Sequence, residues 1–198
     1  MKRVLCVVVT LGVLASSQAF AAGAYVGGFG GVSFLHDSDL TAPGYYDTTL
    51  KYDVGPALGA VGGYRFDEGF RVEGEMGYRY GKIDRASDAL GSYPVTNASL
   101  SLWSFMGNVY YDIKTGSPIS PFIGAGIGFV TGTFDDGWYE SDDTVFGYQA
   151  IAGVSYAINT RINLDLSYRL QGSTDFSFYD GDLSYLSSSV VFGVRYHF

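Results

Sequence analysis

The last nine residues of the chain alternate between large apolar side chains and a second, more polar set. The apolar set is Val190, Phe192, Val194, Tyr196 and Phe198, and the residues between them are Val191, Gly193, Arg195 and His197. Successive side chains of a β-strand point to opposite faces, so a strand of this kind separates an apolar medium from a polar one. The alternation predicts a strand with one face toward lipid and the other toward a polar interior.

The same period of two recurs in three segments nearer the N-terminus. Within residues 70–80, Phe70, Val72 and Met76 alternate with Arg71, Glu73 and Glu75, so the two sets would lie on opposite faces of one strand. Residues 51–66 and 161–171 repeat the pattern. A soluble β-sandwich shows similar alternation, because its apolar faces meet in a core while its polar faces are solvated. Alternation alone therefore leaves the sandwich open as an alternative to a membrane barrel.

The N-terminus carries the features of a secretory signal. Lys2 and Arg3 precede an apolar run over residues 4–15, and residues 19–21 form an A-x-A cleavage site. The run is shorter than the ~20 residues that a membrane-spanning helix requires. We expect residues 1–21 to be a cleaved signal peptide and residues 22–198 to form one domain without cysteine, since Cys6 is the only one. Export favours the membrane barrel over the sandwich.

Eight stretches of strand length follow one another, separated alternately by long polar connections and by short turns. The predicted strands are 24–35, 51–66, 70–83, 100–113, 118–134, 144–158, 161–172 and 186–198. Each exceeds the ~9 to 11 residues that a tilted membrane strand needs. The turns at 67–69, 114–117 and 159–160 contain the Asp, Asn and Gly residues typical of hairpins. The pattern predicts an all-β fold, a closed eight-stranded antiparallel up-and-down transmembrane β-barrel with its short turns toward the periplasm.

Three motifs carry a resemblance to a known family. They are residues 108–113 (NVYYDI), 121–128 (PFIGAGIG) and 193–198 (GVRYHF). The chain resembles the opacity-type, porin-like small outer-membrane barrels, which share the OmpA-like transmembrane architecture. The resemblance implies an integral protein of the bacterial outer membrane, in contact with lipid and lipopolysaccharide, and we expect a monomer. The alternating ending, from Val190 to Phe198, is similar to the signal that the barrel-assembly machinery reads, and we expect no peptidoglycan-binding domain to follow it.

Alternate residues of the predicted strands place a polar and charged set inside the barrel. The set is Arg65, Arg71, Glu73, Glu75, Arg79, Asn108, Asp112, Gln149, Asp165, Arg169 and Arg195. An eight-stranded barrel has a bore just wide enough for its own side chains, whereas an aqueous porin channel takes ~16 to 18 strands. Because an unpaired buried charge costs roughly several kcal/mol, we expect a mutually hydrogen-bonded network. A gated ion path, in which charged pairs switch partners, is the alternative.

The four long connections are strongly acidic. Residues 36–50, 84–99, 135–143 and 173–185 contain thirteen Asp and Glu residues against one basic residue, Arg85. The densest cluster is Asp135, Asp136, Trp138, Tyr139, Glu140, Asp142 and Asp143. Its oxygens suit Ca²⁺ or Mg²⁺ but lack EF-hand spacing, so a solvated loop is the favoured interpretation, and we expect no metal and no cofactor. Exposed aromatic residues in these connections suit docking to a host or cell-surface ligand.

The charge of the chain weighs against nucleic-acid binding, and its histidine content weighs against enzymatic catalysis. Without Lys2 and Arg3, ten basic residues oppose twenty acidic ones, a formal charge of −10, so we expect no nucleic-acid partner. The two histidines, His36 and His197, fall at opposite ends of the predicted barrel, and no Ser-His-acid signature is present. We therefore expect no enzyme, with a lipid-modifying enzyme as a remote alternative. The sequence favours an envelope-structural, adhesin- or antigen-like surface protein over a narrow or gated porin.

Overall fold

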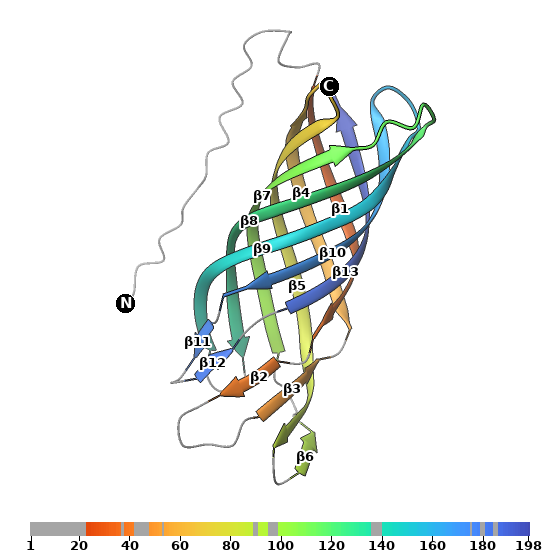
Figure 1. The fold of residues 1–198 in the computed structure, drawn as a ribbon. Helices are drawn as coiled ribbons and strands as arrows, with labels where there is room; N and C mark the ends of the chain where they lie inside the picture. The colour runs from red at the N-terminus through yellow and green to blue at the C-terminus, as the bar shows by residue number, and fades with distance from the viewer. Residues whose placement is uncertain are drawn as a thin grey trace.

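Eight long strands of the computed structural model form a closed barrel (Figure 1). The structure describes residues 23–36, 38–41, 48–52, 54–88, 91–94, 99–135, 140–174, 176–178, 181–183 and 186–198, so the predicted signal peptide lies outside the described residues. The barrel strands are β1 (Ala24–Leu35), β4 (Gly55–Arg65), β5 (Phe70–Asp88), β7 (Ser99–Asp112), β8 (Ile119–Asp135), β9 (Glu140–Ala157), β10 (Ile162–Ser173) and β13 (Leu186–His197). The described residues contain no helix long and apolar enough to cross a membrane.

Every barrel strand pairs antiparallel with both of its neighbours in the ring. The order around the ring is β5, β4, β1, β13, β10, β9, β8 and β7, and β7 pairs again with β5. The first and last strands meet along their length, from Tyr25 opposite His197 to Leu35 opposite Ser187. A sheet that closes on itself leaves no strand edge whose backbone groups lipid would have to satisfy. The predicted closed eight-stranded barrel is therefore confirmed.

Three short connections lie at one end of the barrel, which we call the turn end. They are residues 66–69, 113–118 and 158–161. Gly69 and Gly116 have φ angles of 94° and 71°, in the left-handed region that glycine adopts at little cost. The Oδ1 atom of Asn159 accepts hydrogen bonds from the backbone N–H groups of Arg161 and Ile162, at 2.8 and 2.9 Å. These turns lie where the Asp, Asn and Gly residues predicted them, and they set the up-and-down order of the strands.

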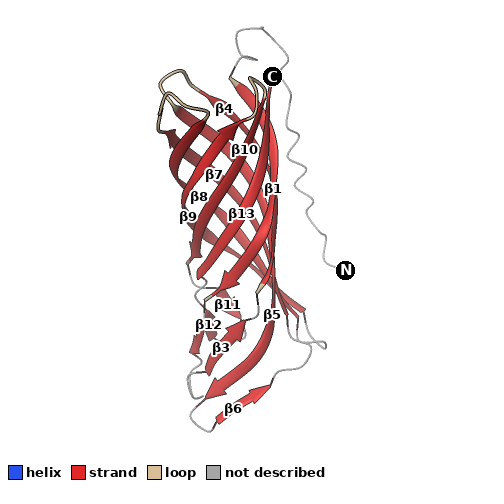
Figure 2. Ribbon diagram, turned by 90° about the vertical axis from the view of Figure 1, so that its right-hand side faces the viewer, coloured by secondary structure: helices blue, strands red, loops and turns tan. Residues whose placement is uncertain are grey.

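The opposite end, which we call the loop end, carries short strands that the sequence pattern did not predict. They are β2 (Ser38–Thr41), β3 (Thr48–Tyr52), β6 (Gly91–Pro94), β11 (Phe176–Phe178) and β12 (Gly181–Leu183). The strand predicted at 70–83 continues to Asp88 as β5, because β3 and β6 pair with this extension. Of the strand predicted at 51–66, residues 55–65 form β4, whereas Lys51 and Tyr52 are the last two residues of β3. The connections expected to be loops are thus partly sheet, which projects beyond the barrel (Figure 2).

Side-chain exposure alternates along the barrel strands as the two-residue period predicts. On β5, Val72 is 42 % exposed, whereas its neighbours Arg71 and Glu73 are 2 % and 6 % exposed. On β13, Phe192 is exposed and Val191 is buried. The apolar face lies outside and the charged face inside, which is the reverse of a soluble sandwich and the arrangement of a membrane barrel.

Aromatic side chains gather on the outward face near both ends of the barrel. Ring centroids lie 4.9 Å apart for Tyr64 and Phe66, 5.1 Å for Phe70 and Tyr111, and 5.6 Å for Tyr196 and Phe198 at the turn end, and 4.9 Å for Tyr78 and Trp103 toward the loop end. Tilted and edge-on aromatic pairs of this kind are favourable. Two aromatic bands at the margins of an apolar surface are typical of the two interfaces of a membrane.

Candidate functional site

Near the turn end the inward side chains form a cluster around Arg71. Its Nε–H group donates to both carboxylate oxygens of Asp112, at 3.0 and 2.9 Å, and its Nη1 atom lies 3.7 Å from Glu73 Oε2. Tyr25 and Tyr110 donate their hydroxyl hydrogens to the two oxygens of Glu73, at 2.8 and 2.9 Å. The carboxylates and phenols of this cluster thus find partners among themselves while buried from solvent.

A second ion pair joins the last strands of the barrel. Arg195 on β13 binds both oxygens of Asp165 on β10 through its Nε and Nη2 atoms, at 2.5 and 2.8 Å. The same Nη2 atom donates to Ser155 Oγ on β9, at 3.0 Å. Bidentate arginine–carboxylate pairs are among the strongest polar contacts in proteins. This pair therefore links three consecutive strands of the ring.

At the centre of the lumen, Glu75 is the shared acceptor. Its Oε2 atom accepts hydrogen bonds from Arg169 Nη1 at 2.6 Å, from Asn108 Nδ2 at 2.9 Å and from Gln149 Nε2 at 3.2 Å. The guanidinium carbon of Arg169 also lies 4.0 Å from the centroid of the Phe29 ring, a cation–π contact. These contacts join β5 to its neighbour β7 and, across the lumen, to β9 and β10, so they brace the barrel wall from inside.

Arg79 lies closer to the loop end and is surrounded by neutral groups. Its Nη1 atom donates to Gln171 Oε1 at 2.7 Å and to Ser104 Oγ at 3.3 Å, and it is 1 % exposed. No carboxylate in the described part of the chain lies within 4.0 Å of it, whereas the other four arginines of the predicted set each have one within 3.7 Å. Five arginines and four carboxylates leave the set with one positive charge in excess.

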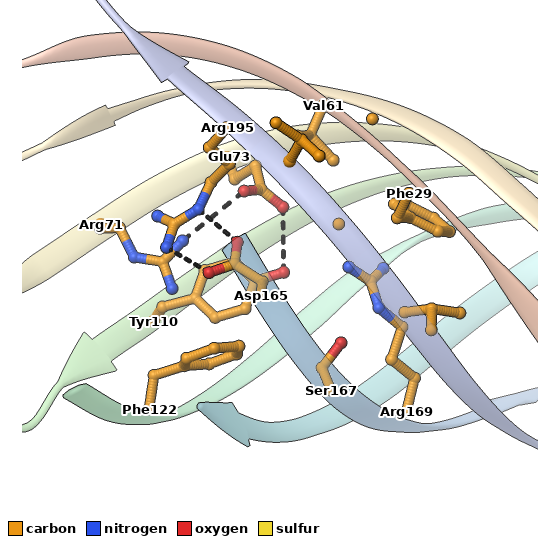
Figure 3. A pocket seen from close by; sticks show the side chains of 14 residues that line it. Phe29, Val61, Arg71, Glu73, Tyr110, Phe122, Asp165, Ser167, Arg169 and Arg195 are labelled. Atoms are coloured by element: carbon orange, nitrogen blue, oxygen red, sulfur yellow. Dashed lines mark hydrogen bonds and ion pairs between the residues drawn. The ribbon is translucent and has the colours of Figure 1, made fainter. Parts of the chain in front are cut away.

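A small cavity lies inside the barrel among these groups (Figure 3). Figure 3 shows Arg71, Glu73, Asp165 and Arg195 gathered on one side of it, and Arg169 beside Phe29 on the other. The cavity has a volume of about 20 Å³, counted as the space open to the centre of a water-sized sphere. A single water-sized guest needs roughly 10 to 15 Å³ by this measure. This cavity therefore has room for a water-sized guest and none for a large solute.

Glycines on the inner face allow large side chains to lie across neighbouring strands. A Cβ atom at Gly63 would lie 2.6 Å from Tyr25 Oη, and one at Gly153 would lie 2.6 Å from Phe122 Cζ. Contacts this short do not occur, so any larger residue would displace the ring. The lumen is thus filled by its own side chains, in the way expected of a barrel of this size.

A wider opening lies at the turn end. Its volume is about 490 Å³, and the residues that line it include Arg65, Lys114, Asn163 and His197. The ring of His197 lies against that of Tyr25, with the centroids 5.2 Å apart. The opening and the small cavity share no lining residue. They are therefore two separate spaces, with the Arg71 cluster between them.

The predicted surface-loop residues are described only in part. Asp136, Trp138 and Tyr139 lie outside the described residues. Asp135 ends β8 opposite Glu140, the first residue of β9. Asp142 is exposed, and Asp143 accepts a hydrogen bond from the backbone N–H of Thr144 at 2.8 Å. Within the described ranges, no group of three or more His, Cys, Asp or Glu side chains lies together in a way that could hold a metal ion.

The residues of the predicted assembly signal all lie on the outward face of β13. Val190, Phe192, Val194, Tyr196 and Phe198 are between 40 and 61 % exposed. The intervening Arg195 and His197 point into the barrel and are buried. A protein that reads this strand from outside would therefore meet only its apolar face.

Sequence reasoning missed contacts that depend on how far neighbouring strands are shifted. Tyr25 and Tyr110 hold Glu73 but were absent from the predicted set, although both occupy inward positions of the same two-residue period. On the outward face near the loop end, His36 Nε2 lies 2.8 Å from Ser188 Oγ, which also contacts Tyr168 Oη at 2.7 Å. Residues 36 and 188 are 152 positions apart, so no local motif could have indicated this contact.

Comparison with known proteins identifies similar sequences and folds. A family model described as outer membrane protein beta-barrel domain matches residues 4–198. Among solved structures, Neisserial surface protein A (NspA) is 22 % identical, with a TM-score of 0.61 over 89 % of this chain and 97 % of that one. The outer membrane protein OprG from Pseudomonas aeruginosa is 16 % identical, with a TM-score of 0.59 over 90 % and 98 % of the two chains. At these identities the likeness concerns the fold alone.

Curated relatives occur in Brucella. Uncharacterized proteins of Brucella abortus (strain 2308), of Brucella suis biovar 1 (strain 1330) and of Brucella melitensis biotype 1 are each 29 % identical over 157 residues. The match covers 62 % of this chain and 55 % of each relative, so the chain spans about half the length of the relatives it matches. The names of these relatives state no activity.

Proposed function

Because the chain belongs to the outer membrane protein beta-barrel domain family, we propose that it is an envelope protein whose filled barrel holds an interaction surface at the cell exterior. The filled lumen is the observation that supports this most. Ion pairs occupy the bore at successive levels, centred on Arg71, Arg195 and Glu75, and the cavity between them is about 20 Å³. A barrel that closes its own bore acts as a rigid support, and its exposed connections carry the specific function.

In this proposal the turn end faces the periplasm and the loop end faces outward. The four connections at the loop end contain thirteen acidic residues and one arginine or lysine. A surface with one sign of charge attracts partners of the opposite sign and repels others, which supports adhesin- or antigen-like contact with a basic host or cell-surface ligand. The outward apolar face meets lipid, and its aromatic margin near the loop end meets lipopolysaccharide.

A cell-adhesion assay tests this function. A variant with the five acidic residues of 135–143 changed to Asn or Gln is expressed in the outer membrane, and binding of the bacteria to host epithelial cells is counted. Neutral loops should lower adhesion severalfold and remove its dependence on salt. The control changes Asp67 and Glu68, at the turn end, to Asn and Gln. Equal adhesion of all three strains would overturn the proposal.

A narrow or gated ion path is the second candidate, because charged groups follow one another from Arg71 to Arg79 along the lumen. Reconstitution in planar bilayers with single-channel recording tests it. Discrete current steps that disappear in Arg79→Gln or Glu75→Gln would support a gated pore. A protein that inserts without such steps would leave the loop end as the functional part.

Export and assembly complete the proposal. Residues 1–21 act as a signal peptide, so the intact mass of the protein in the outer membrane should correspond to a chain that begins at Ala22.

The outward face of β13, with Phe198 at its end, is what the barrel-assembly machinery contacts. Phe198→Ser should then lower the amount of folded barrel in the membrane while leaving export unchanged, and gel filtration of the purified protein should give the mass of a monomer.

A further inference from the structure

We propose that Ser188 and His36, on the outward face of the barrel near the loop end, form a catalytic pair that hydrolyses an acyl ester of a membrane lipid. No local motif links the two residues, which are 152 positions apart, but folding places them side by side. Ser188 is the nucleophile and His36 the base. This activity is separate from the surface interaction proposed above and requires neither a partner at the loop end nor a conducting lumen.

Three neighbouring strands, β1, β13 and β10, bring the pair together (Figure 2). On β1, Phe34 is the partner of Ser188, so His36 lies two positions beyond that partner and on the same outward face. On β10, Leu170 is the partner, and Tyr168 lies two positions before it. Diagonal neighbours of this kind are within reach of ring side chains. The register of the closed barrel therefore places an imidazole and a phenol on either side of one serine.

The hydrogen bonds of Ser188 have the polarity that nucleophilic attack needs. Its Oγ atom lies 2.8 Å from Nε2 of His36 and 2.7 Å from Oη of Tyr168. With the imidazole proton on Nδ1, Nε2 accepts the serine hydrogen, and the phenol donates to the serine oxygen. A serine hydroxyl is a weak nucleophile until a base within about 2.6 to 3.2 Å takes its proton. His36 lies within that distance.

Other hydroxyl contacts on the outward face lack such a base. Oη of Tyr78 lies 3.5 Å from Oγ of Ser101, and the Oγ1 atoms of Thr131 and Thr144 lie 2.9 Å apart. These pairs join neighbouring strands through hydroxyl groups alone. Ser188 differs from them because an imidazole is one of its two partners.

The position of the pair selects a lipid ester as the substrate. Val32 and Val190 belong to the outward apolar surface, at 43 % and 41 % exposed, whereas His36 is exposed just beyond the end of β1. In a bilayer, ester groups lie between the hydrocarbon and the polar headgroups, and the same boundary borders this end of the barrel. An ester-linked acyl chain can therefore meet Ser188 from within the membrane while water reaches His36.

Access to Ser188 passes through Tyr168. Ser188 is 7 % exposed, whereas Tyr168, which contacts its hydroxyl, is 50 % exposed. The substrate carbonyl takes the place of the phenol at Oγ of the serine. The oxyanion that forms is bonded to the same carbon as Oγ, so the displaced phenol can donate its hydrogen bond there. Tyr168 thus acts as the oxyanion donor.

The reaction is an ordinary two-step ester hydrolysis. Oγ of Ser188 attacks the ester carbon while Nε2 of His36 takes the hydroxyl proton. The bond to the lipid alkoxide breaks, the alkoxide leaves with the proton from His36, and the acyl group stays on the serine. A water molecule then gives a proton to His36 and attacks the acyl-serine. The serine oxygen regains that proton, and a free fatty acid leaves.

The test uses the protein purified from outer membranes into detergent. It is incubated separately with lipopolysaccharide and with phosphatidylethanolamine, and released fatty acid is measured by mass spectrometry. Release from either lipid supports the proposal and identifies which lipid supplies the ester. Release from neither lipid would overturn it.

Variants assign the activity to the pair. Ser188→Ala and His36→Gln should each lower the rate about 100-fold or more, because the first removes the nucleophile and the second replaces the base by an amide. Tyr168→Phe should lower kcat with little change in KM, which a merely structural contact would not do. Ser101→Ala, which removes a serine that contacts a tyrosine without a base, is the matched control and should keep the rate. Release that persists in Ser188→Ala shown to be folded by circular dichroism would overturn the proposal.

A second measurement needs no variant. The unaltered protein is treated with a fluorophosphonate, which reacts with serines activated by a base, and its peptides are analysed by mass spectrometry. The label should lie on Ser188. An unlabelled Ser188 would show that its contact with His36 is structural only.

Discussion

At the scale of single residues, Tyr110→Phe should destabilise the barrel through Glu73. The hydroxyl of Tyr110 donates to Glu73 Oε1 at 2.9 Å, and its removal leaves a buried carboxylate oxygen without that donor. The expected loss in the free energy of unfolding is about 1 to 3 kcal/mol. Urea titration in lipid vesicles, followed by tryptophan fluorescence, measures it. Tyr111→Phe, one residue along on the outward face, is the matched control, and a similar loss in both variants would contradict this role of Tyr110.

The lumen shows which aspects of a polar interior can be read from a sequence. The two-residue period predicts that Arg71, Glu75 and Arg169 lie inside, and they are buried there. Their partners cannot be predicted, because Arg71 pairs with Asp112 and Arg169 with Glu75 across 41 and 94 positions of the chain. Such pairing depends on how far each strand is shifted against the next, and alternation within one strand carries no information about that shift.

The glycines of the inner wall give a second prediction at this scale. Gly153→Ala should cost about 1 to 3 kcal/mol, because the new methyl group would lie 2.6 Å from Phe122 Cζ and force the ring to move. At Gly107, on the outward face, the nearest atom to an added Cβ is 3.8 Å away, so Gly107→Ala should be nearly neutral. Thermal unfolding in detergent compares the two, and equal midpoints would mean that the lumen is packed less tightly than the structure shows.

At the scale of strands, β5 illustrates both the strength and the limit of sequence patterns. Its alternation of apolar and charged residues identified the outward and inward faces, and exposure confirms them. Its extension to Asp88 was not predicted, because a strand at the loop end is held by pairing with β3 and β6 rather than by an apolar face. Backbone pairing beyond the lipid leaves little trace in hydrophobicity, so the sequence pattern predicts loops where the short strands of the loop end lie.

Val72→Arg tests the outward face of β5. Val72 lies on the outward face, two residues beyond Phe70 of the turn-end aromatic band, and is 42 % exposed, so an arginine there would meet lipid. The expected destabilisation is about 2 to 4 kcal/mol near the bilayer midplane and falls to roughly 0 to 1 kcal/mol near an interface. Refolding titrations into lipid vesicles measure it, with Phe70→Arg at the turn end as the shallow control. A Val72 variant as stable as the control would place this part of β5 outside the hydrocarbon.

At the scale of the whole molecule, closure follows from the number of strands and the lengths of their connections. Short turns after alternate strands predicted an up-and-down order, and in a ring this order brings the first strand beside the last. The contact between β1 and β13 therefore depends on the whole chain, and no single segment of the sequence indicates it. Its register, with Val32 opposite Val190, came only from the structure, since a shift by two residues would preserve every inward and outward assignment.

A disulfide between cysteines at positions 32 and 190 tests closure and register together. Val32 and Val190 are partners across the β1–β13 contact, and both are exposed on the outward face. Facing Cα atoms of antiparallel strands lie about 4.5 to 5.5 Å apart, within the range that a disulfide spans. In a Cys6→Ser background, the Val32→Cys, Val190→Cys variant should therefore oxidise readily and change its mobility on non-reducing gels after heating.

The mismatched variant Val32→Cys, Phe192→Cys is the control for this experiment. A displacement of two residues adds roughly 7 Å along the strand, which places the Cα atoms beyond the reach of a disulfide bond. It should oxidise much more slowly than the matched pair. Comparable rates would mean that β1 and β13 slide against each other, and an unreactive matched pair would mean that the barrel is open at the junction of its two ends. Only a closed ring in the observed register gives fast oxidation of the matched pair alone.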